Sequence, residues 1–225
     1  MENRAFAVSV AARAAYHRTM ERVDKNEAEN LTQIAVLGTL AEFHRDPLPY
    51  DLTALVDLVA EINPDLLCLD ISLEQWQQQD FSNLPTEYSE ALLPLADQTD
   101  IVVVPIGGAQ MMPQATAVGW RGVLIGWVRK LLAWVQATAP GPDAINQGWR
   151  HELGNVLYGL ARRLAGSAIN HAYHAHIEQL SLAALRVAEN NPGSRILVVT
   201  NIQYCHHVRP QLQQAGLTQT TYKNL

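Results

Sequence analysis

Four short apolar segments limit what this 225-residue chain can fold into. They occupy residues 33–38, 66–70, 100–106 and 195–200, and in each one apolar side chains follow one another directly instead of alternating with polar ones. Both faces of such a segment are apolar, so we expect strands that are buried on both sides, as in a parallel sheet.

Helix-forming sequence separates these segments. Residues 51–62 have apolar side chains at helical spacing, with Asp51 as the N-cap and Pro64 beyond the end. Five further segments have helical character, namely residues 2–29, 120–135, 144–166, 168–190 and 208–214. The alternation predicts a single α/β domain over residues 1–225, with a mainly parallel sheet and helices on both of its faces. Within it, residues 111–190 are predicted to form a central, all-helical insertion.

The composition excludes several classes of protein. The formal net charge is −6, whereas nucleic-acid-binding proteins are typically basic, so we expect no nucleic-acid partner. No apolar run approaches the roughly 18 residues of a membrane span, and Glu2 and Arg13 disfavour a signal peptide, so a cytoplasmic protein is expected. The two cysteines, Cys68 and Cys205, lie in or beside apolar segments and are interpreted as reduced, buried thiols.

The charges are unevenly distributed along the chain. Residues 38–100 contain thirteen acidic side chains and one basic one, whereas residues 111–170 contain six basic and two acidic ones. We interpret this asymmetry as an acidic pocket suited to a cation, with a basic helical lid near it. Two differently charged solvent-exposed faces are the alternative.

Titratable residues follow the predicted strands at their carboxyl ends, where open parallel sheets bind ligands. Glu42 and His44 come after the first strand, Asp70 ends the second, and His206 follows the fourth. Histidine combined with carboxylate is common in divalent metal sites and in acid–base catalysis. We therefore predict Glu42, His44, Asp70 and His206 as catalytic residues, with His44, Asp70 and His206 also as metal ligands. Solvent-facing loop histidines are the alternative.

The helix expected over residues 168–190 adds further candidates. His171 and His174 share the face opposite its apolar stripe, and their spacing allows them to chelate a metal ion, so both are predicted as additional ligands. An exposed polar face is the alternative. His176 lies inside the apolar stripe and is interpreted as a hydrogen-bonded core histidine.

Common catalytic motifs are absent from the sequence. It contains no Gly-x-Gly-x-x-Gly or Gly-Lys-Ser/Thr phosphate loop and no Gly-x-Ser-x-Gly nucleophile elbow. Trp120, Trp127 and Trp134 recur at heptad spacing, which we interpret as helix–helix packing, with a surface for a hydrophobic ligand or partner as the alternative.

The order of the segments resembles that of the TraB/Tiki proteins and of the wider group that includes the erythromycin-esterase-like and ChaN-like haem-binding proteins. The resemblance covers most of the chain and rests on residues 34–39, 63–70, 169–171 and 195–200. In that family a Gly-Thr-x-His motif follows the first strand, a Glu closes the second and a Gly-x-x-His follows the last. These residues imply a His/Glu site that acts through a divalent metal in the peptidase-like members.

This chain departs from each of those motifs. Ala41 stands in place of the first His, Asp70 in place of Glu, and Gln203 in place of the last His. Histidines recur three residues later, at His44 and His206, so the site is either redrawn around them or lost.

Together these features predict a metal-dependent hydrolase, peptidase- or esterase-like, that acts on a small molecule or peptide. The alternative is a catalytically silent protein that binds haem or another hydrophobic ligand, with His44, His171 or His206 as the axial ligand of haem. A third interpretation is a partner-binding module that uses the Trp-bearing helix. The sequence leaves a homo-oligomer open.

Overall fold

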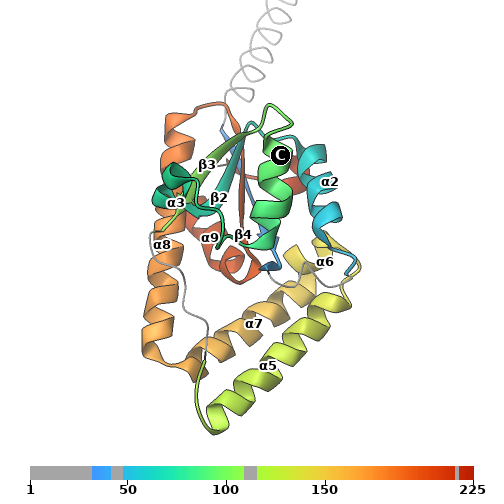
Figure 1. Ribbon diagram of the computed structural model, residues 1–225, viewed down its shortest axis with the longest axis vertical. Coiled ribbons are helices and arrows are strands. Elements are labelled where there is room, and N and C mark those ends of the chain that lie inside the picture. Colours follow the sequence, from blue (N-terminus) through green and yellow to red (C-terminus); the bar gives the residue numbers. More distant parts are fainter. Residues whose placement is uncertain (1–31, 42–47, 109–115, 216–217) are drawn as a thin grey trace, which may run out of the picture.

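The computed structural model describes residues 32–41, 48–108, 116–215 and 218–225 (Figure 1). The helix predicted over residues 2–29 lies outside these ranges. The first part of the described chain contains β1 (Gln33–Thr39), α2 (Leu52–Ile62), β2 (Leu66–Ser72), α3 (Leu73–Gln78), the π-helix η2 (Glu87–Leu92), α4 (Leu93–Ala96) and β3 (Val102–Gly107). The second part contains α5 (Trp120–Ala137), α6 (Pro142–Asn146), α7 (Gly148–Ala165), α8 (Ser167–Asn190), β4 (Arg195–Asn201), α9 (Ile202–Gln214), β5 (Thr218–Gln219) and the 3₁₀ helix η3 (Tyr222–Asn224).

The strands form one parallel sheet in the order β3-β2-β4-β1-β5. The central strand is β4, which pairs with β1 from Gln33 opposite Arg195 to Thr39 opposite Asn201. On its other side β4 pairs with β2, and among the described residues β1 pairs only with β4 and β5. The predicted α/β fold with a parallel sheet is confirmed. β1, α2 and β2 form a strand–helix–strand unit, and β4 lies between its two strands.

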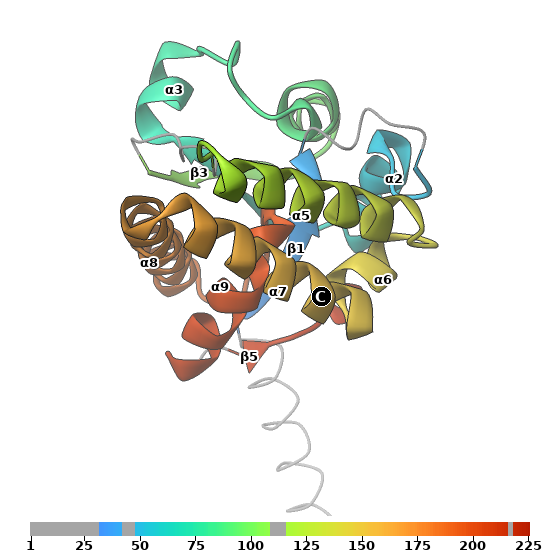
Figure 2. The same ribbon diagram turned by 90° about the horizontal axis from the view of Figure 1, so that it is seen from below.

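Helices cover both faces of the sheet. Figure 2 shows α2, η2 and α4 on one side, and α8 and α9 on the other. The four helices α5 to α8 follow one another between β3 and β4, in the region where the helical insertion is predicted. Of these, α5 and α7 lie side by side across the end of the sheet at which the strands finish (Figures 1 and 2).

The sheet forms the centre of the hydrophobic core. All the interior residues of β4 are buried, as are those of β1, which agrees with the continuous apolar segments from which the strands are predicted. Cys68 and Cys205 are both buried and unpaired, as expected from their apolar surroundings. Four tyrosines, Tyr50, Tyr88, Tyr173 and Tyr222, are among the largest fully buried side chains.

Arg195 ties the beginning of β4 to the ends of two other elements. Its Nε donates to the carbonyl oxygen of Leu225 at 2.6 Å, and its Nη1 donates to that of Asn63 at 2.8 Å. Its Nη2 donates to the carbonyl oxygen of Ile62, the last residue of α2. One guanidinium therefore satisfies carbonyl groups at a helix end that have no partner within the helix.

α5 has two apolar faces, and only one of them is covered. A small second core joins α5 to α7, formed by Val128, Leu132, Leu157 and Ala161. Trp120, Trp127 and Trp134 lie on the other face, where 66%, 66% and 55% of their surface is exposed. The interpretation of these tryptophans as helix-packing residues is wrong. Heptad spacing puts them on one face of the helix, but the side chains between them are the ones that meet α7.

Candidate functional site

A cavity of about 380 Å³ lies at the carboxyl ends of β2 and β4. β2 contributes Asp70 and Ser72 to its wall, and β4 contributes Asn201. The chain leaves β2 toward β3 at one edge of the sheet, whereas it leaves β4 toward β5 at the opposite edge. Neighbouring strands whose connections diverge in this way mark the crevice in which open α/β sheets bind ligands.

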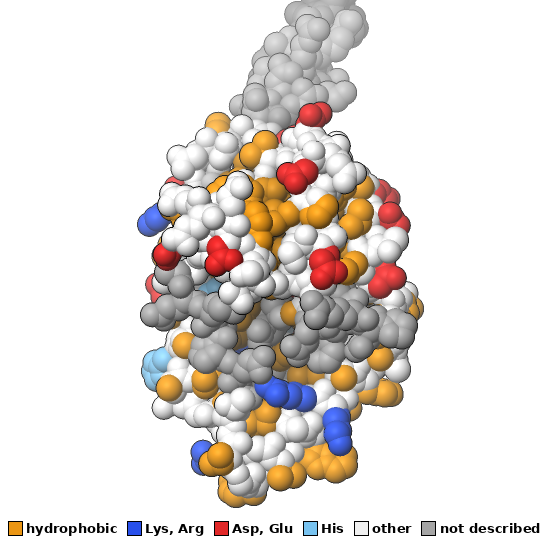
Figure 3. All heavy atoms as spheres, in the orientation of Figure 1, with side chains coloured by type: hydrophobic (Ala, Val, Ile, Leu, Met, Phe, Trp, Pro, Cys, Tyr) orange, Lys and Arg blue, Asp and Glu red, His pale blue; other side chains and the backbone are white. Residues whose placement is uncertain are grey.

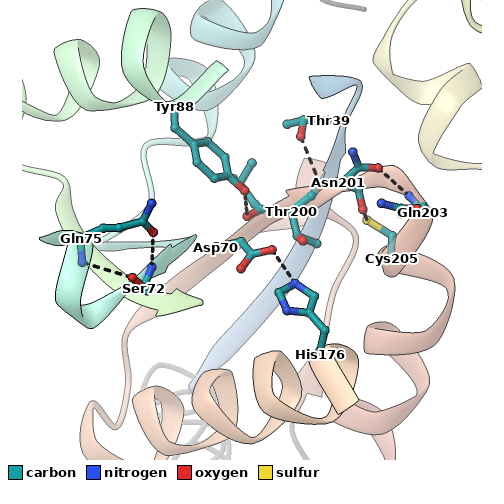
Figure 4. A network of polar contacts seen from close by, with 11 residues as sticks. Thr39, Asp70, Ser72, Gln75, Tyr88, His176, Thr200, Asn201, Gln203 and Cys205 are labelled. Atoms are coloured by element: carbon teal, nitrogen blue, oxygen red, sulfur yellow. Dashed lines mark hydrogen bonds and ion pairs between the residues drawn. The ribbon is translucent and has the colours of Figure 1, made fainter. Parts of the chain in front are cut away.

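A hydrogen-bonded pair, Asp70 and His176, lies in the wall of this cavity (Figure 4). The Nε2 atom of His176, from α8, lies 2.8 Å from Oδ2 of Asp70, and both side chains are largely buried. The ring of Tyr204 packs against the imidazole with the ring centres 4.9 Å apart. The hydrogen bond to Asp70 confirms the interpretation of His176 as a hydrogen-bonded core histidine. His176 also lines the cavity.

The hydrogen bond to Asp70 determines which nitrogen of His176 is free to act. A carboxylate accepts a proton donor, so the neutral ring carries its proton on Nε2 and leaves a lone pair on Nδ1. Nδ1 lies near Gly108, another residue of the cavity wall, since a Cβ built on that glycine would be 3.9 Å from it. The pair therefore has the arrangement of a general base held in one tautomer by an acid.

Glu87 is a buried acid in the same wall, with 1% of its surface exposed. It is the first residue of η2, and its Oε1 accepts a hydrogen bond from the hydroxyl of Thr39 at 2.8 Å. Its Oε2 has no hydrogen-bond partner among the described residues. Burial raises the pKa of this carboxyl, while hydrogen bonds from its own backbone, Thr39 and the Ala41 backbone oppose the rise. Glu87 therefore keeps its proton to a higher pH than an exposed glutamate does.

Two buried tyrosines add neutral hydroxyl groups to the wall. The hydroxyl of Tyr88 donates to the carbonyl oxygen of Val199 at 3.0 Å. Burial raises the pKa of Tyr88 and of Tyr204, and the nearby charge of Asp70 raises both further. Both phenols are therefore protonated at neutral pH.

The cavity is negatively polarised. Four of its described wall residues are acidic, namely Asp70, Glu74, Asp80 and Glu87, and none is a lysine or an arginine. A capping box at Ser72 and Gln75 starts α3 directly at the end of β2, so Glu74 lies in the first turn of a helix that faces the cavity. Such a wall attracts cations and repels anions.

Of the residues predicted for the site, Asp70 lines the cavity. Glu42 and His44 lie outside the described residues. Within the described ranges, no three or more His, Cys, Asp or Glu side chains are grouped so that they could hold a metal ion. Asp70 and His176 provide two such groups, whereas catalytic zinc sites typically use three protein ligands.

The other three predicted histidines lie away from the cavity wall. His206, on α9, has its Nδ1 3.9 Å from a carboxylate oxygen of Glu152 on α7. The ring of His174 meets that of His207, with the centres 6.1 Å apart. Nδ1 of His171 lies 2.8 Å from the carbonyl oxygen of the residue one turn earlier in α8.

Comparison of the chain with protein-family models, with curated proteins and with solved structures finds no match. The resemblance to the TraB/Tiki and ChaN-like proteins therefore stays a prediction from short motifs. None of the helices in the described ranges is long and apolar enough to cross a membrane.

Proposed function

We propose that this chain is a hydrolase that cleaves a small polar molecule in the cavity between β2 and β4 by general acid–base catalysis. The observation that supports the proposal is that one cavity wall contains both the Asp70–His176 pair and the buried carboxyl of Glu87. Hydrolysis needs a base to activate water and an acid to protonate the leaving group. Enzymes usually keep a deprotonated base and a protonated acid at the same pH by placing the two titratable groups in different environments.

In the proposed reaction, Nδ1 of His176 takes a proton from a water molecule as the water oxygen attacks the carbonyl carbon of the substrate. Asp70 stabilises the imidazolium that forms, through its hydrogen bond to Nε2. Protonated Glu87 gives its proton to the leaving group as the scissile bond breaks. The imidazolium then releases its proton to solvent and Glu87 regains one, so that each turnover consumes one water molecule.

The charge of the cavity favours one class of substrate. Glu87 is neutral when it is protonated, so the charge of the described wall comes from Asp70, Glu74 and Asp80, with no lysine or arginine beside them. Such a wall favours a neutral or cationic ester or amide over an anionic one. An amino-terminal peptide amide and an ester with an amino group both fit this description. Within the described ranges no third metal-ligating side chain joins Asp70 and His176, so the mechanism is written with these two residues and Glu87 alone.

A panel of chromogenic esters and aminoacyl anilides, in cationic, neutral and anionic versions, tests the proposal. We expect wild-type protein to hydrolyse a cationic or neutral member, and Asp70→Asn and His176→Gln to lower kcat/KM about 100-fold or more. Glu87→Gln should lower kcat and remove the loss of rate on the alkaline side of the pH profile. Asn83→Ala changes a wall residue without an acid–base role and is the matched control.

The same assays distinguish the alternatives. Activity that disappears on chelation and returns with added Zn²⁺ would point to the metal-dependent mechanism instead. If no member of the panel is hydrolysed but some of them raise the melting temperature, the cavity serves ligand binding without catalysis.

A further inference from the structure

The outer face of α5 is an apolar stripe that the described part of the chain leaves uncovered. We define this face by the five residues Trp120, Val123, Trp127, Leu131 and Trp134. Each of them is between 42% and 66% exposed. Their spacing places them in line along a helix of 18 residues, which is about 27 Å long. The opposite face of α5 packs on α7, so the helix is fixed to the fold while the stripe remains accessible.

Basic side chains accompany the stripe. α5 contains Arg121, Arg129 and Lys130 and no acidic residue. The guanidinium of Arg121 lies 5.6 Å from the ring centre of Trp120, and the ammonium of Lys130 lies 5.4 Å from that of Trp127. The first turn and the middle of the stripe thus each combine an indole with a positive charge.

Acidic and basic side chains lie mostly at opposite ends of the molecule on the face that Figure 3 shows. Figure 3 shows the Asp and Glu side chains in the upper half of the visible face. Apart from a basic side chain at the upper left edge, the visible Lys and Arg side chains lie toward the lower end, where α5 lies. An anionic surface would therefore attract the α5 end of the molecule and repel the acidic end.

We propose that the outer face of α5 binds the surface of membranes that contain anionic lipids. Tryptophan is enriched at the boundary between lipid headgroups and acyl chains, and basic side chains beside it pair with anionic headgroups. A second copy of the chain docked through the same face would bring two basic helices together, and their mutual repulsion disfavours that occupant. An anionic lipid surface can contact both the apolar side chains of the stripe and the basic side chains beside it. This proposal does not depend on the proposed hydrolase reaction.

Co-sedimentation of the full chain with lipid vesicles tests the proposal. We expect binding to phosphatidylcholine vesicles that contain about 30% phosphatidylglycerol, and at least about tenfold weaker binding to pure phosphatidylcholine or in about 0.5 M salt. Binding should shift the tryptophan emission to shorter wavelength. Trp127→Ser combined with Trp134→Ser should weaken binding about tenfold or more. Leu182→Ser, at an exposed apolar position on α8, is the matched control and should bind like wild type.

A second variant separates the charge from the apolar stripe. Arg121→Gln combined with Lys130→Gln should reduce binding to the anionic vesicles without changing the melting temperature, because both positions are exposed. The proposal is overturned if wild-type protein does not bind the anionic vesicles, or if the double tryptophan variant binds as well as the wild type does. If the wild type is a dimer that binds no vesicles, and the double tryptophan variant is a monomer, the face is instead a contact between two copies of the chain.

Discussion

Replacing Glu87 with glutamine isolates the energetic effect of one buried carboxyl. Burial raises the pKa of Glu87 in the folded chain above 4.5, the ordinary value that applies to the unfolded chain. At a pH between 4.5 and the folded-state pKa, the folded chain therefore keeps a proton that the unfolded chain has lost. The contribution of this group to stability is therefore complete below pH 4.5 and is lost as the pH rises through the folded-state pKa. Within that window the free energy of unfolding should fall by up to about 1.4 kcal/mol per pH unit.

The assay is urea unfolding of the wild type and of Glu87→Gln in half-unit steps from about pH 4 to pH 8. Glutamine does not titrate, so the difference between the two proteins reports this carboxyl alone and should decline through the window. An amide nitrogen in the place of the unpartnered Oε2 adds a cost of about 1–3 kcal/mol that does not vary with pH. Glu90→Gln, at an exposed position of the same π-helix, is the matched control for removing one carboxyl group. A wild-type-minus-variant difference that stays constant across this pH range would refute the reasoning.

Three further outcomes follow from the same structure. Thr39→Val removes the hydroxyl that donates to the buried carboxyl, so it should raise that pKa further and extend the pH window in the same urea series. Arg195→Ala removes three hydrogen bonds to carbonyl groups and should cost about 3 kcal/mol or more, whereas Arg186→Ala, at an exposed position, should change stability by less than about 0.5 kcal/mol. Burial raises the pKa of Cys68 to about 12 and that of Cys205 to about 11, so a coloured disulfide reagent should label both thiols much faster in urea than in the native state; rapid native labelling of either would contradict their burial.

Local sequence was sufficient to predict four of the five strands of the described sheet, but neither the short strand β5 nor the order of the strands. The continuous apolar segments predict β1, β2 and β4, because strands covered by helices on both faces need apolar residues at consecutive positions. The same pattern predicts β3, although this edge strand is only partly buried. Nothing in such a segment specifies its neighbour, and so the position of β4 between β1 and β2 was not predicted. The start of α9 was also missed. Its first residues are mixed in polarity, and the signal for the true start is the side chain of Asn201, which caps the helix.

The candidate site was predicted only where a strand leads directly into it. Asp70 was found because it ends an apolar segment. His176 reaches the same place from a helix more than a hundred residues later, so its partnership with Asp70 is not visible in the sequence. Glu87 is one of thirteen acidic residues in its region, and only the packing of η2 against the ends of the strands distinguishes it from the exposed ones.

The position of β4 also bears on the order in which the chain acquires its structure. Thr39 and Thr200, at the ends of β1 and β4, are 161 residues apart, and β1 has no strand partner in the described chain before residue 195. During synthesis, β1 therefore leaves the ribosome long before either of its neighbours exists, and its backbone edges stay open until the last part of the chain arrives. Closing so long a loop is entropically costly and slows folding. For a newly made copy, the interval before β4 inserts is the period in which it is most exposed to aggregation.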